Sequence, residues 1–256
     1  MKNLTKIQRR FSRGGWLTLV LLGAALAFSN ARAELLFSDS FAYPVGPLAG
    51  DGPPPNSPPG QSGWTSLNLN PQVVASSLRH RPIRSAGNSV TLSDSNDANG
   101  DAASASLTPV GGSAGGNVWL GFLMRQGAAA LPGFGVLTFN DGFGPAAPQF
   151  GVIFESKRYG IDNSIIPRMT SYSTVRAGTA TVWVVVKLDF TAGQQMLFLN
   201  PSSANESDLQ PQATLAMTPE FQASGFDRIV LKEGYSMGTF TFDEVRVGTT
   251  YSDVRH

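Results

Sequence analysis

Three features of the sequence predict an all-β protein, built as an antiparallel sandwich or barrel. Short apolar segments recur about every 8–20 residues, and Gly, Pro and Asn-Asp turns separate them. In the segment 182–190 every second residue is apolar, which is typical of a strand with one face in a core. No segment keeps the 3.6-residue apolar period of an amphipathic helix.

The first 33 residues have the three parts of an export signal. Residues 1–15 are basic, residues 16–28 form an apolar run, and Ala31 and Ala33 supply the small side chains that a signal peptidase reads. The run is shorter than the ~20 apolar residues that cross a bilayer, which disfavours a membrane anchor. We therefore expect cleavage after Ala33, no membrane span in the mature protein, and a single domain, 34–256, that is secreted or periplasmic.

Composition and charge limit the partners of this domain. The chain has no Cys, which excludes thiolate metal sites and a cysteine nucleophile. Six of the 19 basic residues and none of the 18 acidic residues lie in 1–33, so the mature domain has 13 basic residues and a net charge of −5. This charge repels a polyanion overall, so we expect no nucleic-acid partner, whereas a polysaccharide or glycan is a suitable one.

The mature domain opens with a predicted strand, 35–41, and continues with a Pro/Gly-rich segment, 44–63. Such a segment cannot pair in a sheet, so we interpret it as a surface loop, with a proline-rich ligand for another protein as the alternative. A helical turn is expected near 216–223. The other predicted strands are 73–78, 89–93, 104–110, 118–125, 135–140, 151–156, 182–190, 196–200, 213–217, 227–232 and 238–247.

Both ends of the mature domain resemble a known group of proteins. Residues 36–44 read LFSDSFAYP, and residues 242–254 read FDEVRVGTTYSDV. Together they look like the ends of secreted bacterial domains with the concanavalin A-like, laminin-G-like jelly roll of lectins and glucanases. The resemblance implies an antiparallel two-sheet jelly-roll sandwich, and it implies a fold much more than a function.

The last predicted strand has apolar residues on both of its faces. A strict period of two places successive side chains on opposite faces. The strand 238–247 then carries Asp243, Val245 and Val247 on one face, and Phe240, Phe242, Glu244 and Arg246 on the other.

Two carboxylates fall on apolar faces of the first and last predicted strands. Asp39 lies between Phe37 and Phe41, and Asp243 shares a face with Val245. The first and last strands of the jelly roll that the ends resemble are often neighbours, so we expect Asp39 and Asp243 to lie near each other at the sandwich edge. A buried carboxylate needs hydrogen-bond donors or a cation. We interpret both as acceptors of backbone N–H groups, with a structural Ca²⁺ site as the alternative and no other cofactor.

Two tryptophans on predicted strands indicate a sugar-binding platform. Trp119 shares a face with Arg125, and Trp183 shares a face with Lys187. If these strands are adjacent, the indole rings could stack on the apolar faces of pyranose rings while the cations contact hydroxyl groups. The alternative is that both tryptophans are core residues.

Catalytic patterns in the sequence are incomplete, so we name no catalytic residue. Residues 111–115 match G-x-S-x-G, but a predicted strand follows where a nucleophile elbow needs a helix. Glycoside hydrolysis needs two carboxylates across the scissile bond, yet Glu155 stands alone, and Asp243 and Glu244 are adjacent. The oxygen-rich segment 94–101 fails the EF-hand pattern and is interpreted as a polar loop.

These observations favour an exported, non-catalytic β-sandwich that binds carbohydrate or takes part in envelope or matrix interactions. One alternative is a polysaccharide hydrolase or lyase on the same fold, with carboxylates that converge from distant strands. The other alternative is a structural module that binds protein through the loop 44–63.

Overall fold

The computed structural model describes residues 33–68, 71–93, 100–127, 133–154, 156–165, 167–235 and 238–255. Residues 1–32 of the predicted export signal, Glu155 and residues 94–99 of the oxygen-rich segment lie outside the described residues. Within the described ranges, no helix has the length and apolar character that a membrane crossing needs.

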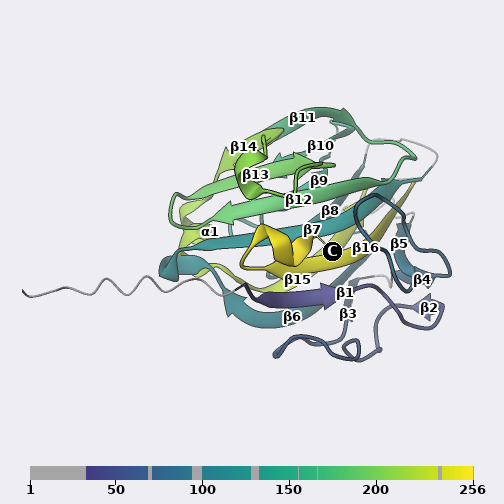
Figure 1. Ribbon diagram of the computed structural model, residues 1–256. Coiled ribbons are helices and arrows are strands. Elements are labelled where there is room, and N and C mark those ends of the chain that lie inside the picture. The colour runs from purple at the N-terminus through teal and green to yellow at the C-terminus, as the bar shows by residue number, and fades with distance from the viewer. Residues whose placement is uncertain are drawn as a thin grey trace, which may run out of the picture. The chain divides into compact units, whose positions relative to one another are not determined.

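The described chain is composed almost entirely of strands, which form two sheets (Figure 1). The nine-stranded sheet contains β1 (Leu35–Asp39), β2 (Gly46–Pro47), β4 (Gln72–Val74), β5 (Ser89–Ser93), β7 (Asn117–Gln126), β12 (Val182–Asp189), β13 (Gln194–Leu199), β14 (Ala213–Ala216) and β16 (Thr239–Gly248). The seven-stranded sheet contains β3 (Thr65–Asn68), β6 (Ala102–Val110), β8 (Phe134–Phe139), β9 (Gln149–Val152), β10 (Arg158–Asp162), β11 (Thr170–Arg176) and β15 (Phe226–Gly234). The short helices are η1 (Gly112–Ala114), η2 (Glu206–Asp208), α1 (Pro219–Ser224) and η3 (Tyr251–Val254).

The two sheets are antiparallel and pack face to face as a sandwich. The larger sheet has the order β14-β13-β12-β7-β16-β5-β4-β2, with β1 also paired to β16, and the smaller has the order β11-β10-β9-β8-β15-β6-β3. Every strand pair in both sheets is antiparallel. This architecture confirms the predicted all-β, jelly-roll sandwich.

The apolar core lies between the sheets, and its pattern follows the alternation of the strands. In β12, the side chains of Val184, Val186 and Leu188 belong to this core, as the period of two predicted. The opposite face of β12 is partly covered as well, with Lys187 and Asp189 partly exposed. Trp183 and Val185 belong to a second apolar cluster, which the segment before β5 and the turn η3 cover. Both faces of the larger sheet are therefore buried around β7 and β12.

The order of elements matches most of the predicted strands and adds four. The strand 89–93 has the predicted bounds, and the helical turn expected near 216–223 is α1. Thr218 caps α1, because its hydroxyl accepts a hydrogen bond from the amide of Phe221 at 3.1 Å. The motif at 111–115 forms the turn η1 between β6 and β7, and a strand follows it, as expected. The strands β2, β3, β10 and β11 were not among the predicted ones. Since β2 lies in the segment 44–63 and pairs with β4, the expectation that this segment cannot pair in a sheet is wrong for Gly46 and Pro47.

A bulge in β16 changes the predicted faces of the last strand. The register with β7 shifts between Asp243 and Arg246, and Glu244 has a left-handed backbone with φ of 50°. As a result Phe240 and Phe242 before the bulge, and Val245 after it, all belong to the core between the sheets. The expectation of two mixed faces is therefore wrong, because a strict period of two cannot describe a strand that contains an extra residue.

The same bulge marks a change of neighbour along β16. Residues 239–242 pair with β5, whereas residues 245–248 pair with β1, and β7 runs along the other side. β1 and β16, the first and last strands of the described chain, are neighbours, as expected, with Asp39 opposite Val245. Within the described residues β1 pairs with no strand other than β16, whereas β16 has strands on both sides. The expected position of Asp39 and Asp243 near each other at the sandwich edge stays a prediction.

A glycine inside the sandwich makes the close approach of the two sheets testable. A Cβ atom on Gly135 of β8 would overlap the ring of Phe240 from β16. We expect Gly135→Ala to lower the free energy of unfolding by about 1–3 kcal/mol through overpacking. Gly178→Ala is the matched control, because its Cβ would meet no atom within 4 Å. Urea denaturation of both variants tests this, and equal effects would contradict the close approach.

Candidate functional site

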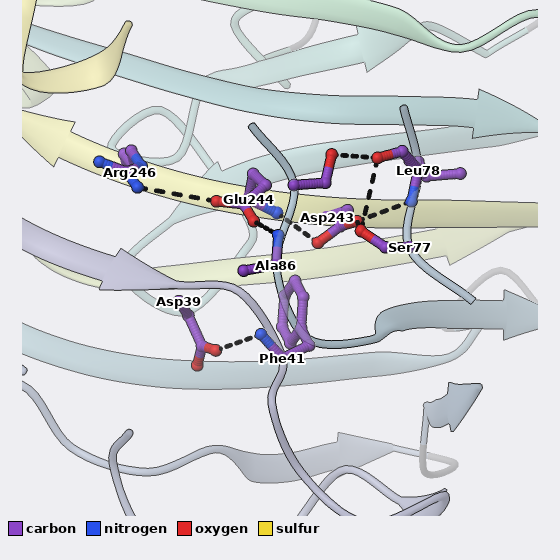
Figure 2. A network of polar contacts seen from close by, with 9 residues as sticks. Asp39, Phe41, Ser77, Leu78, Ala86, Asp243, Glu244 and Arg246 are labelled. Atoms are coloured by element: carbon purple, nitrogen blue, oxygen red, sulfur yellow. Dashed lines mark hydrogen bonds and ion pairs between the residues drawn. The ribbon is translucent and has the colours of Figure 1, made fainter. Parts of the chain in front are cut away.

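Asp243 is held by donors from the segment that precedes β5 (Figure 2). Its Oδ2 accepts hydrogen bonds from the hydroxyl of Ser77 at 2.8 Å and from the amide of Leu78 at 2.7 Å. Its Oδ1 accepts from the amide of Glu244 at 2.8 Å. The side chain has no exposed surface, and burial raises its pKa from 3.8 to about 7 despite these donors.

Glu244 holds the far end of the same segment. Its Oε1 accepts a hydrogen bond from the amide of Ala86 at 2.6 Å, and its Oε2 lies 3.7 Å from the guanidinium of Arg246. Burial raises the pKa of Glu244, and the nearby charge of Asp39 raises it further. The two residues of the bulge thus fix residues 77–86 against the larger sheet at both ends, as the dashed lines in Figure 2 show.

Asp39 organises the start of the Pro/Gly-rich loop. Its carboxylate accepts hydrogen bonds from the amide of Phe41 at 2.7 Å, the hydroxyl of Tyr43 at 2.7 Å and the indole N–H of Trp64 at 2.8 Å. The indole ring of Trp64 also packs against Phe37 and Phe41. Trp64 therefore secures both ends of the loop 44–63, and burial raises the pKa of Asp39.

Asp39 and Asp243 both accept hydrogen bonds from protein donors. Each carboxylate accepts a backbone N–H together with side-chain donors, as the first interpretation requires. The described residues hold no group of three or more His, Cys, Asp or Glu side chains that could bind a metal ion. The Ca²⁺ alternative stays a prediction.

The structure brings the predicted sugar platform together on one face of two paired strands. Trp183 lies opposite Leu123, and Lys187 lies opposite Trp119, because β12 pairs with β7. Both indole rings are only 1% exposed. They pack under Tyr251 of η3, with ring centroids 5.2 Å and 6.2 Å away.

The two predicted cations of this platform have different surroundings. The ammonium of Lys187 lies 5.4 Å from the ring of Trp119 and forms an ion pair with Glu206 at 2.8 Å. Arg125 lies on β7 opposite Thr241. A sugar would reach the indole rings of this platform only if η3 moved away, so sugar binding there stays a prediction.

A different cluster lies on the outer face of the seven-stranded sheet. Ile229 and Leu231 of β15 belong to the core, so Val230 and Lys232 point to the opposite face. Here a pocket of about 290 Å³ opens over β6 and β15. Its lining consists of Leu67, Asn68, Ala102, Asp141, Phe143, Val230 and Lys232.

The loop between β8 and β9 forms one wall of this pocket. Asn140 fixes the loop, because its side-chain amide donates to the carbonyl oxygens of Ala146 at 2.7 Å and Gly225 at 3.3 Å. The carboxylate of Asp141 accepts a hydrogen bond from the amide of Phe143 at 3.2 Å. The ring of Phe143 is 53% exposed, which is unusual for so large an apolar side chain in an ordered turn.

Lys232 is a buried cation that faces this pocket. It is 2% exposed, and its ammonium lies 3.2 Å from the ring centroid of Phe143 and 5.8 Å from that of Phe134. Among the described residues it forms no ion pair. Burial lowers its pKa to about 8, and the charge of Asp141 opposes this shift. A ligand that supplies acceptor oxygens would give this ammonium hydrogen-bond partners.

A second, wider pocket adjoins the first at the same loop. Its volume is about 760 Å³, and Asp141 and Phe143 line both pockets. Asn140, Asp227 and Arg228 add polar groups to the wider pocket. The exposed ring of Phe143 thus stands between two open hollows that carry donors and acceptors, the arrangement of a site for a polar ligand with apolar faces.

Sequence reasoning missed this cluster, although one signal pointed to it. The strand 227–232 was predicted, and its period of two places Arg228, Val230 and Lys232 on one face. A lysine inside an apolar strand is rarely buried without a reason. The contribution of Phe143 had no such signal, because it depends on how the loop after β8 folds over the sheet.

Comparisons with known proteins agree with the fold. Neither a protein-family model nor a curated protein sequence matches the chain. Solved structures with the same two-sheet sandwich do match it, so the chain has an antiparallel jelly-roll sandwich fold.

Three of these structures cover most of the chain. Domain 4 of AbnA, a GH43 extracellular arabinanase from Geobacillus stearothermophilus in complex with arabinotriose, has a TM-score of 0.52 and 10% identity and covers 87% of this chain and 97% of its own. The endo-1,3-β-glucanase from Streptomyces sioyaensis has a TM-score of 0.50 and 9% identity, with coverage of 84% and 96%. The T. cruzi calreticulin globular domain has a TM-score of 0.50 and 11% identity, with coverage of 87% and 91%.

Other matches are partial. The chain spans 46% of the structure of the botulinum neurotoxin DC binding domain in complex with rat synaptotagmin II, with a TM-score of 0.45. At these identities the likeness shows the fold alone.

Stability should fall as the pH rises from about 4.5 to 7.5. The folded-state pKa of Asp243, about 7, exceeds its ordinary value of 3.8, so over this interval the folded state keeps a proton that the unfolded state has released. The pKa values of Asp39 and Glu244 shift in the same direction. Lys232 acts in the opposite sense above about pH 8, and His80 acts in the opposite sense below its ordinary pKa of 6.5, because burial lowers its pKa. Urea denaturation across this range should show a shallower slope for Asp243→Asn, and equal slopes would contradict the assignment.

The melting temperature should not depend on calcium. The carboxylates of Asp39 and Asp243 already accept hydrogen bonds from protein donors, so a bound Ca²⁺ would have to displace these donors. Thermal melts in excess CaCl₂ and in excess EDTA are the measurement. A rise in Ca²⁺ that Asp39→Asn or Asp243→Asn abolishes would instead establish the metal site.

Proposed function

We propose that this protein is an exported, non-catalytic carbohydrate-binding module, and that its glycan binds on the outer face of the seven-stranded sheet. The observation that carries the proposal is the buried ammonium of Lys232, which faces an open pocket beside the exposed ring of Phe143. An ammonium donates to sugar hydroxyls, and an aromatic ring stacks on the apolar face of a pyranose.

The neighbouring polar groups suit the same ligand. Asn68 and Asp141 line the pocket with Lys232, so donors and acceptors surround a space of about 290 Å³. The wider pocket on the other side of Phe143 gives room for further sugar residues of a chain. Two of the similar folds belong to an arabinanase domain in complex with arabinotriose and to a β-glucanase, which supports carbohydrate as the ligand class.

The cellular part of the proposal rests on the sequence. The basic, apolar and small-residue parts of residues 1–33 support export, with the mature protein in the periplasm or outside the cell. A glycan ligand suits that location, because envelope and matrix polysaccharides are found there.

Replacing Lys232 by Met should separate binding from stability. Methionine keeps most of the length of the side chain and removes the buried charge, so we expect an unfolding free energy equal to the wild type or about 1 kcal/mol higher. Glycan affinity should fall tenfold or more, because a charged donor is lost. An array of plant, algal and bacterial oligosaccharides identifies the ligand, and calorimetric titration with the strongest one measures the loss.

A second variant of the site and one control variant sharpen this experiment. Phe143→Ala should also weaken binding, since it removes the stacking surface, whereas Lys187→Met should leave binding unchanged. Loss of binding in Lys187→Met alone would favour the platform of Trp119 and Trp183. An array without any response from folded protein would contradict carbohydrate binding and favour a protein-binding module. New reducing ends or unsaturated products from the same polysaccharides would establish the hydrolase or lyase alternative.

A further inference from the structure

The segment before β5 carries a concentration of positive charge. Residues 79–84 read RHRPIR, with Arg79, Arg81 and Arg84 exposed at the surface. None of these three arginines forms an ion pair within the described parts of the chain. The mature domain as a whole has an excess of acidic residues, so this cluster of cations is a local feature of the surface and not a consequence of composition.

The cationic segment is a hairpin with a fixed base. His80 and Ile83 form an antiparallel bridge, and the side chains of Leu78 and Ile83 are buried in the apolar cluster that contains Trp119. At its two ends, the amides of Leu78 and Ala86 donate to the buried carboxylates of the β16 bulge. The arginines therefore project from a backbone that is already ordered, which lowers the entropy lost when a ligand binds.

The hairpin also contains an open pocket lined by hydrogen-bond donors. Arg79, His80, Arg81, Ile83 and Ser85 line an open pocket of about 490 Å³. Burial lowers the pKa of His80, so near neutral pH its imidazole is uncharged and offers one donor and one acceptor. The guanidinium groups supply planar pairs of N–H donors, which match the geometry of carboxylate and sulfate oxygens.

We propose that this hairpin is a second binding site, which takes the carboxylate or sulfate groups of an anionic polysaccharide. The acidic remainder of the domain disfavours a polymer with the dense charge of nucleic acid. An anionic membrane surface fits less well, because the apolar side chains Leu78 and Ile83 are buried and are not available for insertion into lipid. The site lies over the larger sheet, so it acts independently of Lys232.

Matched polymers and matched variants test this site. The purified protein should bind dextran sulfate and polygalacturonate but not uncharged dextran of the same length, and added salt should weaken binding. The variant Arg79→Gln/Arg81→Gln should lose about tenfold or more in affinity for dextran sulfate. The control Arg158→Gln/Arg176→Gln removes the same charge from β10 and β11 and should keep the affinity. Thermal melts should show both variants folded, because the replaced side chains are not buried.

The contrary outcomes are distinct. Equal loss in both double variants would overturn the proposal, since it would show a response to net charge alone. Equal binding of dextran and dextran sulfate would overturn it as well. Binding of duplex DNA as strong as that of dextran sulfate would replace the polysaccharide by polyanions in general. Lys232→Met should keep its affinity for dextran sulfate, so failure of this site and failure of the proposed glycan pocket can be told apart.

Discussion

The bulge at Asp243 and Glu244 is the constraint on which much of the structure depends. It lets β16 border β7 on one side while β5 and β1 share the other, and it turns two carboxylates toward the segment before β5. These carboxylates accept hydrogen bonds from two amides and one hydroxyl of residues 77–86. The bonds hold this segment over the outer face of the larger sheet. That cover buries Trp119 and Trp183 and turns the arginines of the hairpin outward. One extra residue in one strand thus decides which surfaces are available to ligands.

How much of the fold could be predicted depended on the strength of the local alternation. The strands β5 and β12 were found because the segments 89–93 and 182–190 alternate, and β7 because 118–125 is a short apolar run between turn signals. The strand β11 was missed because residues 170–176 are rich in Ser and Thr and mostly lie outside the core. The strand β10 was missed because it is only five residues long, with Tyr159 and Ile161 as its only apolar core residues. The bulge in β16 could not be inferred, since nothing in the residues 240–247 distinguishes an inserted residue from regular alternation.

For the candidate sites too, the contacts that loops make could not be predicted from the sequence. The sequence left open whether the strands of Trp119 and Trp183 are adjacent, and β7 and β12 do pair. The exposure of the two rings depends on η3 and the segment before β5, which are distant in sequence. The donors to Asp39 and Asp243 likewise come from loops, so only the need for donors was predictable. The position of Lys232 on its strand could be predicted from the sequence. The ring of Phe143, which covers its ammonium, belongs to a loop whose path the sequence does not reveal. Loops, more than strands, determine the chemistry of this sandwich.

The place of β16 in the larger sheet has a consequence for how the chain folds. This strand follows all others of its sheet in sequence, yet it lies between β7 on one side and β5 and β1 on the other. Until residues 239–248 are in position, β7 has an open edge and the first strand has no partner. The contacts that close the sheet join residues far apart in sequence, and such contacts form slowly. Folding of this domain is therefore a late, cooperative event, and partly synthesised chains expose sheet edges that other chains can pair with.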